Sequence, residues 1–192
     1  MNEKIFKDLF DFHLKSIEGH CLKVKWALKK FAKSKLAEEL GFSQSDINDI
    51  AEAHDEDKCD PFGPFTEEYA IISGVYNGKL NPEDYPYNSK LDKATKYHIK
   101  NKRHHPEYWD NNWEPEPVKT WTERKSSKHT TANGSDMDDI SIIEMVCDWK
   151  AQGISQGNTA KWWADKCKKD GRYIFKDDQW ELIYEILDIV DN

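Results

Sequence analysis

The sequence contains no apolar run that approaches the ~20 residues of a membrane-spanning helix. It also lacks an apolar segment after its first residues, Met1 to Lys4, so we expect no secretory signal and a cytoplasmic protein. Basic residues are outnumbered, with 28 Lys and Arg against 36 Asp and Glu and a net charge of −8. Because a general nucleic-acid binder is normally basic, we expect neither a membrane nor a nucleic acid as partner.

Closely spaced cysteine pairs are missing as well. The four cysteines, Cys21, Cys59, Cys147 and Cys167, are far apart in the sequence, which disfavours a zinc ribbon or a redox dithiol. In a reducing compartment we expect four free thiols, each acting as a small buried apolar residue.

Core-forming residues are plentiful, since 38% of the chain is apolar and Trp, Tyr and Phe occur 8 times each. The 192 residues fit a single domain over 1–192, at roughly 100–200 residues per domain. Apolar residues recur at steps of three and four, which predicts an all-α helical bundle. Helices are expected over about 17–31, 43–54, 66–76, 90–104, 137–152, 159–169 and 177–190, with a capping box at Ser43 and Asp46 and stops at Gly41, Gly153 and Gly171.

The segment 106–135 is the least regular part of the chain, with three prolines, a glycine and a Ser/Thr/Asn cluster. It predicts a long loop or lid, because structureless loops of this length are uncommon unless they are functional. Its aromatic residues, Tyr108, Trp109, Trp113 and Trp121, either fill core beneath the loop, which we favour, or stack on a base.

His54-Asp55, at the end of the second expected helix, is followed by Lys58. An imidazole and a carboxylate side by side can bind one divalent ion, and a nitrogen and oxygen ligand set suits Mn, Fe, Co, Ni or Zn, or Mg where carboxylates dominate. The Lys58 ammonium could hold a phosphate oxygen. The alternative is a helix terminus with a solvated Asp.

Three further residues point toward the same interior. His20 borders the apolar stripe of its helix. At about 100° per residue, Asp148 borders the apolar face that begins at Ile140, and Glu144 lies closer to the middle of that face. Buried carboxylates are costly unless they are paired or bind a metal. Internal salt bridges or exposure to solvent are the alternatives for the two acids.

The order His20, His54-Asp55, Asp148 resembles the metal-binding signature of the HD-domain phosphohydrolase superfamily. More closely, segments 54–58, 98–109 and 144–149 resemble a family of small phage and bacterial proteins with an HD-like core. The resemblance implies a compact HD-like domain and cytoplasmic location, in the host if the source is viral. It also implies a divalent metal held by His20, His54, Asp55 and Asp148, and a phosphate contact at Lys58.

The histidines at 98, 104 and 105 are further candidates. The HD-GYP phosphodiesterases have an adjacent His-His pair that binds more than one metal, and His104-His105 looks similar, although no Gly-Tyr-Pro follows. We therefore expect one or two metals per chain. The alternative is a helix end with cationic side chains.

Lysines and arginines cluster in two stretches, with six lysines between Glu18 and Glu38 and six cations between Ser89 and His105. Such a positive surface attracts polyanions, although solvated helix faces explain most lysines equally well. The expected substrate contacts are Lys23, Lys100, Arg103 and Trp109.

The expected function is a metal-dependent phosphohydrolase of a small phosphorylated substrate, with a nucleotide favoured, that cleaves a phosphomonoester, phosphodiester or phosphoanhydride. Lys58, His98 and Glu144 are its expected catalytic residues, which offset phosphate charge or orient water. The alternatives are a non-catalytic metal- or nucleotide-binding protein, such as a viral sequestering factor, and a purely structural interaction module. A homo-oligomer is left open.

Overall fold

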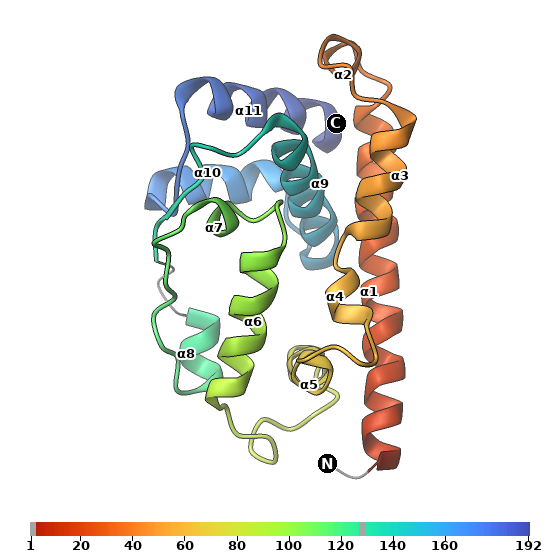
Figure 1. Ribbon diagram of the computed structural model, residues 1–192, viewed down its shortest axis with the longest axis vertical. Helices are drawn as coiled ribbons and strands as arrows, with labels where there is room; N and C mark the ends of the chain where they lie inside the picture. The colour runs from red at the N-terminus through yellow and green to blue at the C-terminus, as the bar shows by residue number, and fades with distance from the viewer. Residues whose placement is uncertain (1–2, 127–129) are drawn as a thin grey trace. The chain divides into compact units, whose positions relative to one another are not determined.

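The computed structural model describes residues 3–126 and 130–192 (Figure 1). Of the described residues, 67% are helical, which confirms the all-α prediction. The helices are α1 (Glu3–Phe31), α2 (Lys35–Glu39), α3 (Gln44–Ala53), α4 (Glu56–Cys59), α5 (Thr66–Tyr76), α6 (Ser89–Asn101), α7 (Pro106–Trp109), α8 (Trp121–Ser126), α9 (Asp139–Gln156), α10 (Ala160–Asp170) and α11 (Asp177–Asp191). Among the described residues, no helix is long and apolar enough to cross a bilayer.

Two compact units make up the chain. The first unit comprises Met1–Gly19, Asp55–Asn101 and Glu114–Thr130, and the second comprises His20–His54, Lys102–Trp113 and Thr131–Asn192. One boundary between the units falls inside α1, after Gly19, and another falls between His54 and Asp55. A single domain over 1–192 stays a prediction.

Helix α9 is the centre of the second unit and packs against α10 and α11. Its buried residues lie on most sides of the helix rather than on one stripe, which is the pattern of a core helix. Two features of α9 differ from the prediction. Ile140 is exposed, and the predicted stop at Gly153 is wrong. Gly153 lies inside the helix, where a Cβ would come within 2.7 Å of the Asn158 carbonyl oxygen, and α9 ends instead at Gly157, whose φ is +71°.

In the first unit, α5 packs against α6, and Val75, Leu91 and Trp121 form a buried cluster. Trp121 begins α8, so the segment 106–135 is more regular than predicted. It holds α7, α8 and the strand β1 (Ala132–Asn133), which pairs in parallel with β2 (Tyr173–Ile174). The burial of Trp113 and Trp121 supports core filling, and a lid role stays a prediction.

Several helix boundaries follow local chemistry as predicted. Ser43 and Asp46 form the capping box of α3, and Gly171, with a φ of +63°, ends α10. Helix α6 ends at Asn101, earlier than predicted, which leaves His104 and His105 in the connection before Pro106 begins α7. None of the four cysteines forms a disulfide, as expected, and Cys147 and Cys167 are buried, whereas Cys21 and Cys59 are only half-buried.

Core packing of α9 gives the first testable prediction. Ile142 is fully buried, whereas Ile140 on the same helix is 49% exposed. Ile142→Ala should lower the free energy of unfolding by about 2–5 kcal/mol because it leaves a cavity. The matched control Ile140→Ala should change it by no more than about 0.5 kcal/mol. Urea denaturation followed by circular dichroism measures both, and equal losses would contradict the packing described for α9.

Candidate metal centre

Five side chains of the second unit meet in what we call the histidine–carboxylate cluster. Its members are His20, His54, His104, Glu144 and Asp148. They come from separate parts of the sequence: α1, the residue that ends α3, the α6–α7 connection and α9. Glu144 and Asp148 lie one turn apart on α9 and therefore share a face. The structure thus brings together three of the four expected metal ligands with two further candidates.

Three donor atoms of this cluster converge. His20 Nε2 lies 2.9 Å from Asp148 Oδ1 and 3.2 Å from His54 Nε2, and the latter nitrogen lies 3.8 Å from Asp148 Oδ1. A triangle with these sides has a point about 2 Å from every corner, which is the bond length from a zinc-like ion to a His nitrogen or a carboxylate oxygen. The spacing and chemistry of the donors are therefore compatible with a metal site.

Glu144 bonds to two histidines of the cluster. Its Oε1 accepts hydrogen bonds from His54 Nδ1 and His104 Nδ1, each at 2.8 Å. A neutral His that donates through Nδ1 keeps the lone pair on Nε2, so this contact directs His54 Nε2 toward His20 and Asp148 as an acceptor. Metal-binding histidines are commonly oriented by a carboxylate in this way.

Both carboxylates of the cluster are held in the ionised form. Burial alone would raise the pKa of Glu144, but the hydrogen bonds from His104 and His54 outweigh it and lower that pKa to about 2. Burial likewise opposes ionisation of Asp148, yet the contact with His20 and the neighbouring His54 and His104 rings move its pKa well below the usual range. The cluster therefore offers negative charge that a cation can neutralise.

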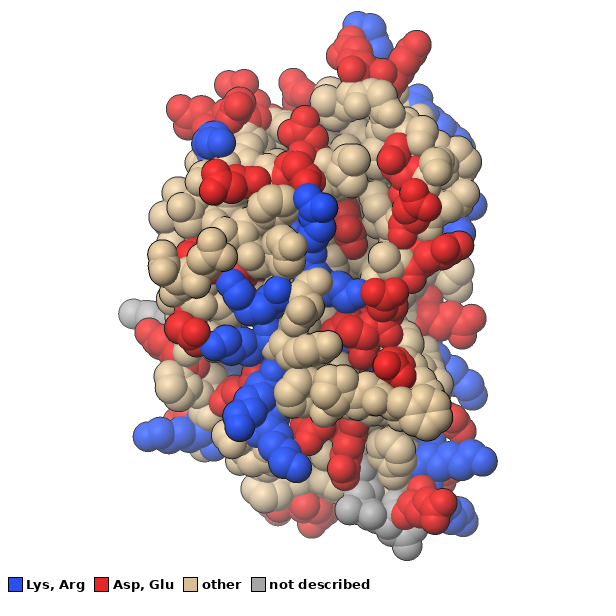
Figure 2. Space-filling model, in the orientation of Figure 1, with Lys and Arg blue, Asp and Glu red and all other residues tan. Residues whose placement is uncertain are grey.

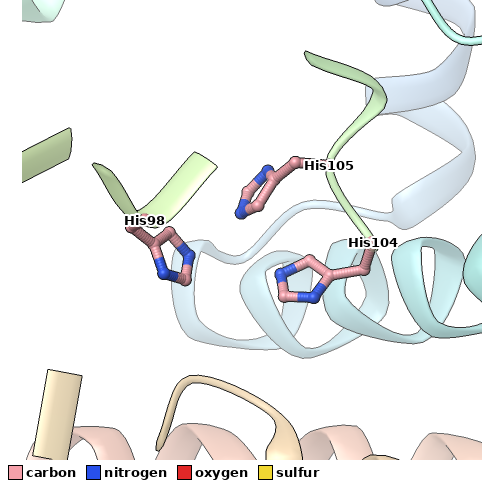
Figure 3. Close-up of side chains that lie close together, drawn as sticks. All are labelled: His98, His104 and His105. Carbon is pink, nitrogen blue, oxygen red and sulfur yellow. The ribbon is translucent and has the colours of Figure 1, made fainter. Parts of the chain in front are cut away.

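His104 and His105 are neighbours in the α6–α7 connection, with ring centroids 4.3 Å apart, whereas His98 projects from α6 (Figure 3). His54 also packs on His104, at 4.6 Å between ring centroids. Of the adjacent pair, His104 is the one that bonds to Glu144, and the expected metal role of His105 stays a prediction.

A second group of charged residues lies within the first unit, and we call it the α4 cluster: Asp55, Asp57, Lys58 and His98. Lys58 Nζ lies 2.9 Å from Asp55 Oδ2. His98 lies between the two acids, with Nδ1 3.0 Å from Asp57 Oδ2 and Nε2 3.3 Å from Asp55 Oδ1. Burial, reinforced by the Lys58 charge, lowers the pKa of His98 to about 4, so its ring is neutral at pH 7.

Asp55 has an unusual backbone. It is the only non-glycine residue of the described chain with a positive φ, +57°, and it stands between α3 and α4. Such a conformation is costly for a residue with a Cβ and often marks a functional position. The two consecutive residues make different polar contacts. His54 bonds to Glu144 in the second unit, and Asp55 bonds to Lys58 in the first.

Two residues of the α4 cluster and its surroundings escaped sequence analysis. Asp57 bonds to His98 and accepts a hydrogen bond from the Tyr69 hydroxyl. His13 is buried, and its Nε2 lies 2.9 Å from the Lys58 carbonyl oxygen, a helix-end carbonyl that needs a donor. The signal for His13 was its spacing, since it lies seven residues before His20 on the same helix.

The expected substrate contacts make internal contacts as well. Lys23 donates a hydrogen bond to Ser155, and Arg103 pairs with Asp138. The Trp109 indole donates a hydrogen bond to the Arg103 carbonyl, and the Arg103 guanidinium lies over the Trp109 ring. Lys100 is half-buried on α6, and Figure 2 shows lysine and arginine side chains gathered over that helix. Their roles in substrate binding stay predictions.

The contacts of Glu144 with His54 and His104 can be tested by measuring the free energy of unfolding. In chelator-treated protein, Glu144→Gln should lower the free energy of unfolding by about 1.5–3 kcal/mol, because charged hydrogen bonds to two histidines are weakened. The control is Glu185→Gln on the exposed face of α11, which should change stability little. Chemical denaturation measures the difference, and equal effects of the two variants would show that the Glu144 contacts add nothing.

Comparison with known proteins finds one related family. Residues 9–189 match the model of a family of unknown function, DUF5662. No curated protein matches the chain, and no solved structure matches it. Since the match extends over nearly all of the 192 residues, the chain belongs to the family DUF5662.

Proposed function

We propose that this protein is a metal-dependent phosphohydrolase that acts on a small phosphorylated substrate, with a nucleotide as the favoured class. The observation that carries the proposal is the convergence of His20 Nε2, His54 Nε2 and Asp148 Oδ1 around one point at metal-bonding distance. Two imidazoles and one carboxylate suit a first-row transition metal better than magnesium. When bound, such a metal supplies polarisation of a phosphoryl oxygen and a bound water of lowered pKa.

The resemblance to the HD-domain superfamily supports the same assignment. The three converging residues are three of the four that the resemblance implies as ligands. Asp55, the fourth, follows His54 directly in the chain, so their Cα atoms are about 3.8 Å apart. Its ligand role is part of the proposal, as is a phosphate contact by Lys58, whose ammonium Asp55 holds at 2.9 Å.

In this proposal Glu144 is a positioning residue. It holds His54 and His104 through one oxygen atom and so fixes the direction of both rings. The lysines of α6 add a positive surface that attracts the phosphorylated substrate (Figure 2). His98, neutral at pH 7, can donate a hydrogen bond to a phosphoryl oxygen or accept one from water.

Metal content is the first test of this proposal. Protein purified and then incubated with Mn, Co, Ni or Zn should hold at least one ion per chain by elemental analysis, and its melting temperature should rise with metal concentration. Asp148→Asn and His54→Ala should lose both effects, because each removes one of three converging donors. Asp139→Asn, an exposed acid on the same helix, should keep them. Equal metal content in wild type and Asp148→Asn would refute this metal site.

Turnover is the second test. A phosphate-release screen over nucleotides and sugar phosphates with Mn, Mg, Co and Ni should find at least one substrate. Asp148→Asn should lower kcat by at least about 100-fold, while helical circular dichroism stays intact and Asp139→Asn keeps activity. Tight binding of metal and nucleotide without turnover would instead indicate a sequestering protein. Absence of metal binding would favour the remaining alternative, a purely structural interaction module.

A further inference from the structure

Helices α10 and α11 border an open cavity of about 470 Å³, a volume within the range of small-molecule sites. Both helices belong to the second unit and pack against each other. One side chain of α10 and five of α11 line the cavity: Lys168, Asp177, Trp180, Glu181, Tyr184 and Glu185. The lining therefore combines two aromatic rings with three acids and one lysine.

The two aromatic rings of the cavity already hold a cation. Trp180 and Tyr184 lie one turn apart on α11, with ring centroids 6.1 Å apart. The Lys168 ammonium lies 4.9 Å from the centroid of the Trp180 ring and 5.2 Å from that of Tyr184. Tyr184 stays neutral at pH 7 because partial burial and its hydrogen bond to Asp165 raise its pKa to about 12. The pair is thus a cation-binding surface, on which the ammonium of a ligand can replace that of Lys168.

Three acids line the cavity beside the rings. Asp177, Glu181 and Glu185 are exposed and recur every four residues, so they form a row along α11, which we call the acid row. At 1.5 Å per residue, the acid row extends over about 12 Å. Helix α11 carries six acids and no Lys or Arg, which attracts cations. Among the described residues, the groups of three or more donors close enough to share a metal ion all lie outside α11, which favours an extended organic cation over a metal ion.

We propose that this cavity binds an aliphatic polyamine, with one ammonium on the Trp180–Tyr184 pair and the others along the acid row. The number of charges on the ligand distinguishes this class from simpler amines. A monoamine would only exchange its ammonium for that of Lys168 on the same rings and gain no new contact. Each further ammonium of a polyamine gains an acid of the row, while its methylene groups can lie along the aromatic surface. This inference does not depend on the proposed phosphohydrolase function.

Calorimetric titration of the full chain tests the proposal, in phosphate-free buffer of constant ionic strength. Spermidine should bind more tightly than hexanediamine, and both should bind more tightly than hexylamine or the neutral hexanediol. Lys168→Met should strengthen spermidine binding by about 2- to 5-fold, because the rings become free and a repelling charge is removed. Lys169→Met removes the same charge from an exposed lysine outside the lining and should change binding by less than about 1.5-fold.

Variants of the rings and of the acid row complete the test. Tyr184→Leu and Glu181→Gln should each weaken spermidine binding by about 2- to 5-fold, whereas Tyr184→Phe, which keeps a ring, should retain it. Asp178→Asn, on the same helix but outside the lining, is the matched control for the lost charge. Hexylamine or hexanediol that binds as tightly as spermidine would overturn the proposal, as would equal affinities of Lys168→Met and Lys169→Met. Equal losses in Glu181→Gln and Asp178→Asn would indicate nonspecific attraction to α11 and reject the cavity as the site.

Discussion

One carboxylate oxygen organises the candidate metal centre. Glu144 Oε1 accepts the Nδ1 protons of His54 and His104, and this contact determines which nitrogen of each ring keeps its lone pair. His54 Nε2 then faces His20 Nε2 and Asp148 Oδ1, at distances compatible with a shared cation. The cost of burying an ionised Glu is offset by these two hydrogen bonds, which also keep its pKa low. The orientation of the His54 and His104 rings therefore depends on Glu144.

The left-handed conformation of Asp55 is the second constraint. Asp55 stands between α3 and α4, where the two consecutive residues make different polar contacts: His54 bonds to Glu144, and Asp55 bonds to Lys58 and His98. A regular helical continuation would have placed the two side chains about 100° apart around one axis. A left-handed backbone is costly for a residue with a Cβ, so the rest of the structure must stabilise Asp55 in this conformation.

Much of the fold could be predicted from local chemistry. The capping box of α3, the span of α5 and the glycine end of α10 follow from residues that act within one turn. Predictions failed where a distant contact decided the outcome. In the segment 106–135, which was predicted to be a loop, Trp121 at the start of α8 packs with Val75 of α5 and Leu91 of α6. The predicted stop at Gly153 is wrong because α9 continues to Gly157, which has the left-handed conformation.

For the candidate site, the sequence by itself determined which residue types were present and, through helical spacing, which of them lie near a buried face. His20, His54, Glu144 and Asp148 could be selected on that basis because periodicity is a local property. Only the tertiary structure decided that Glu144 bonds two histidines and that Asp57 and His13 support the α4 cluster. These facts depend on contacts between residues tens of positions apart, and neither composition nor periodicity encodes such distances.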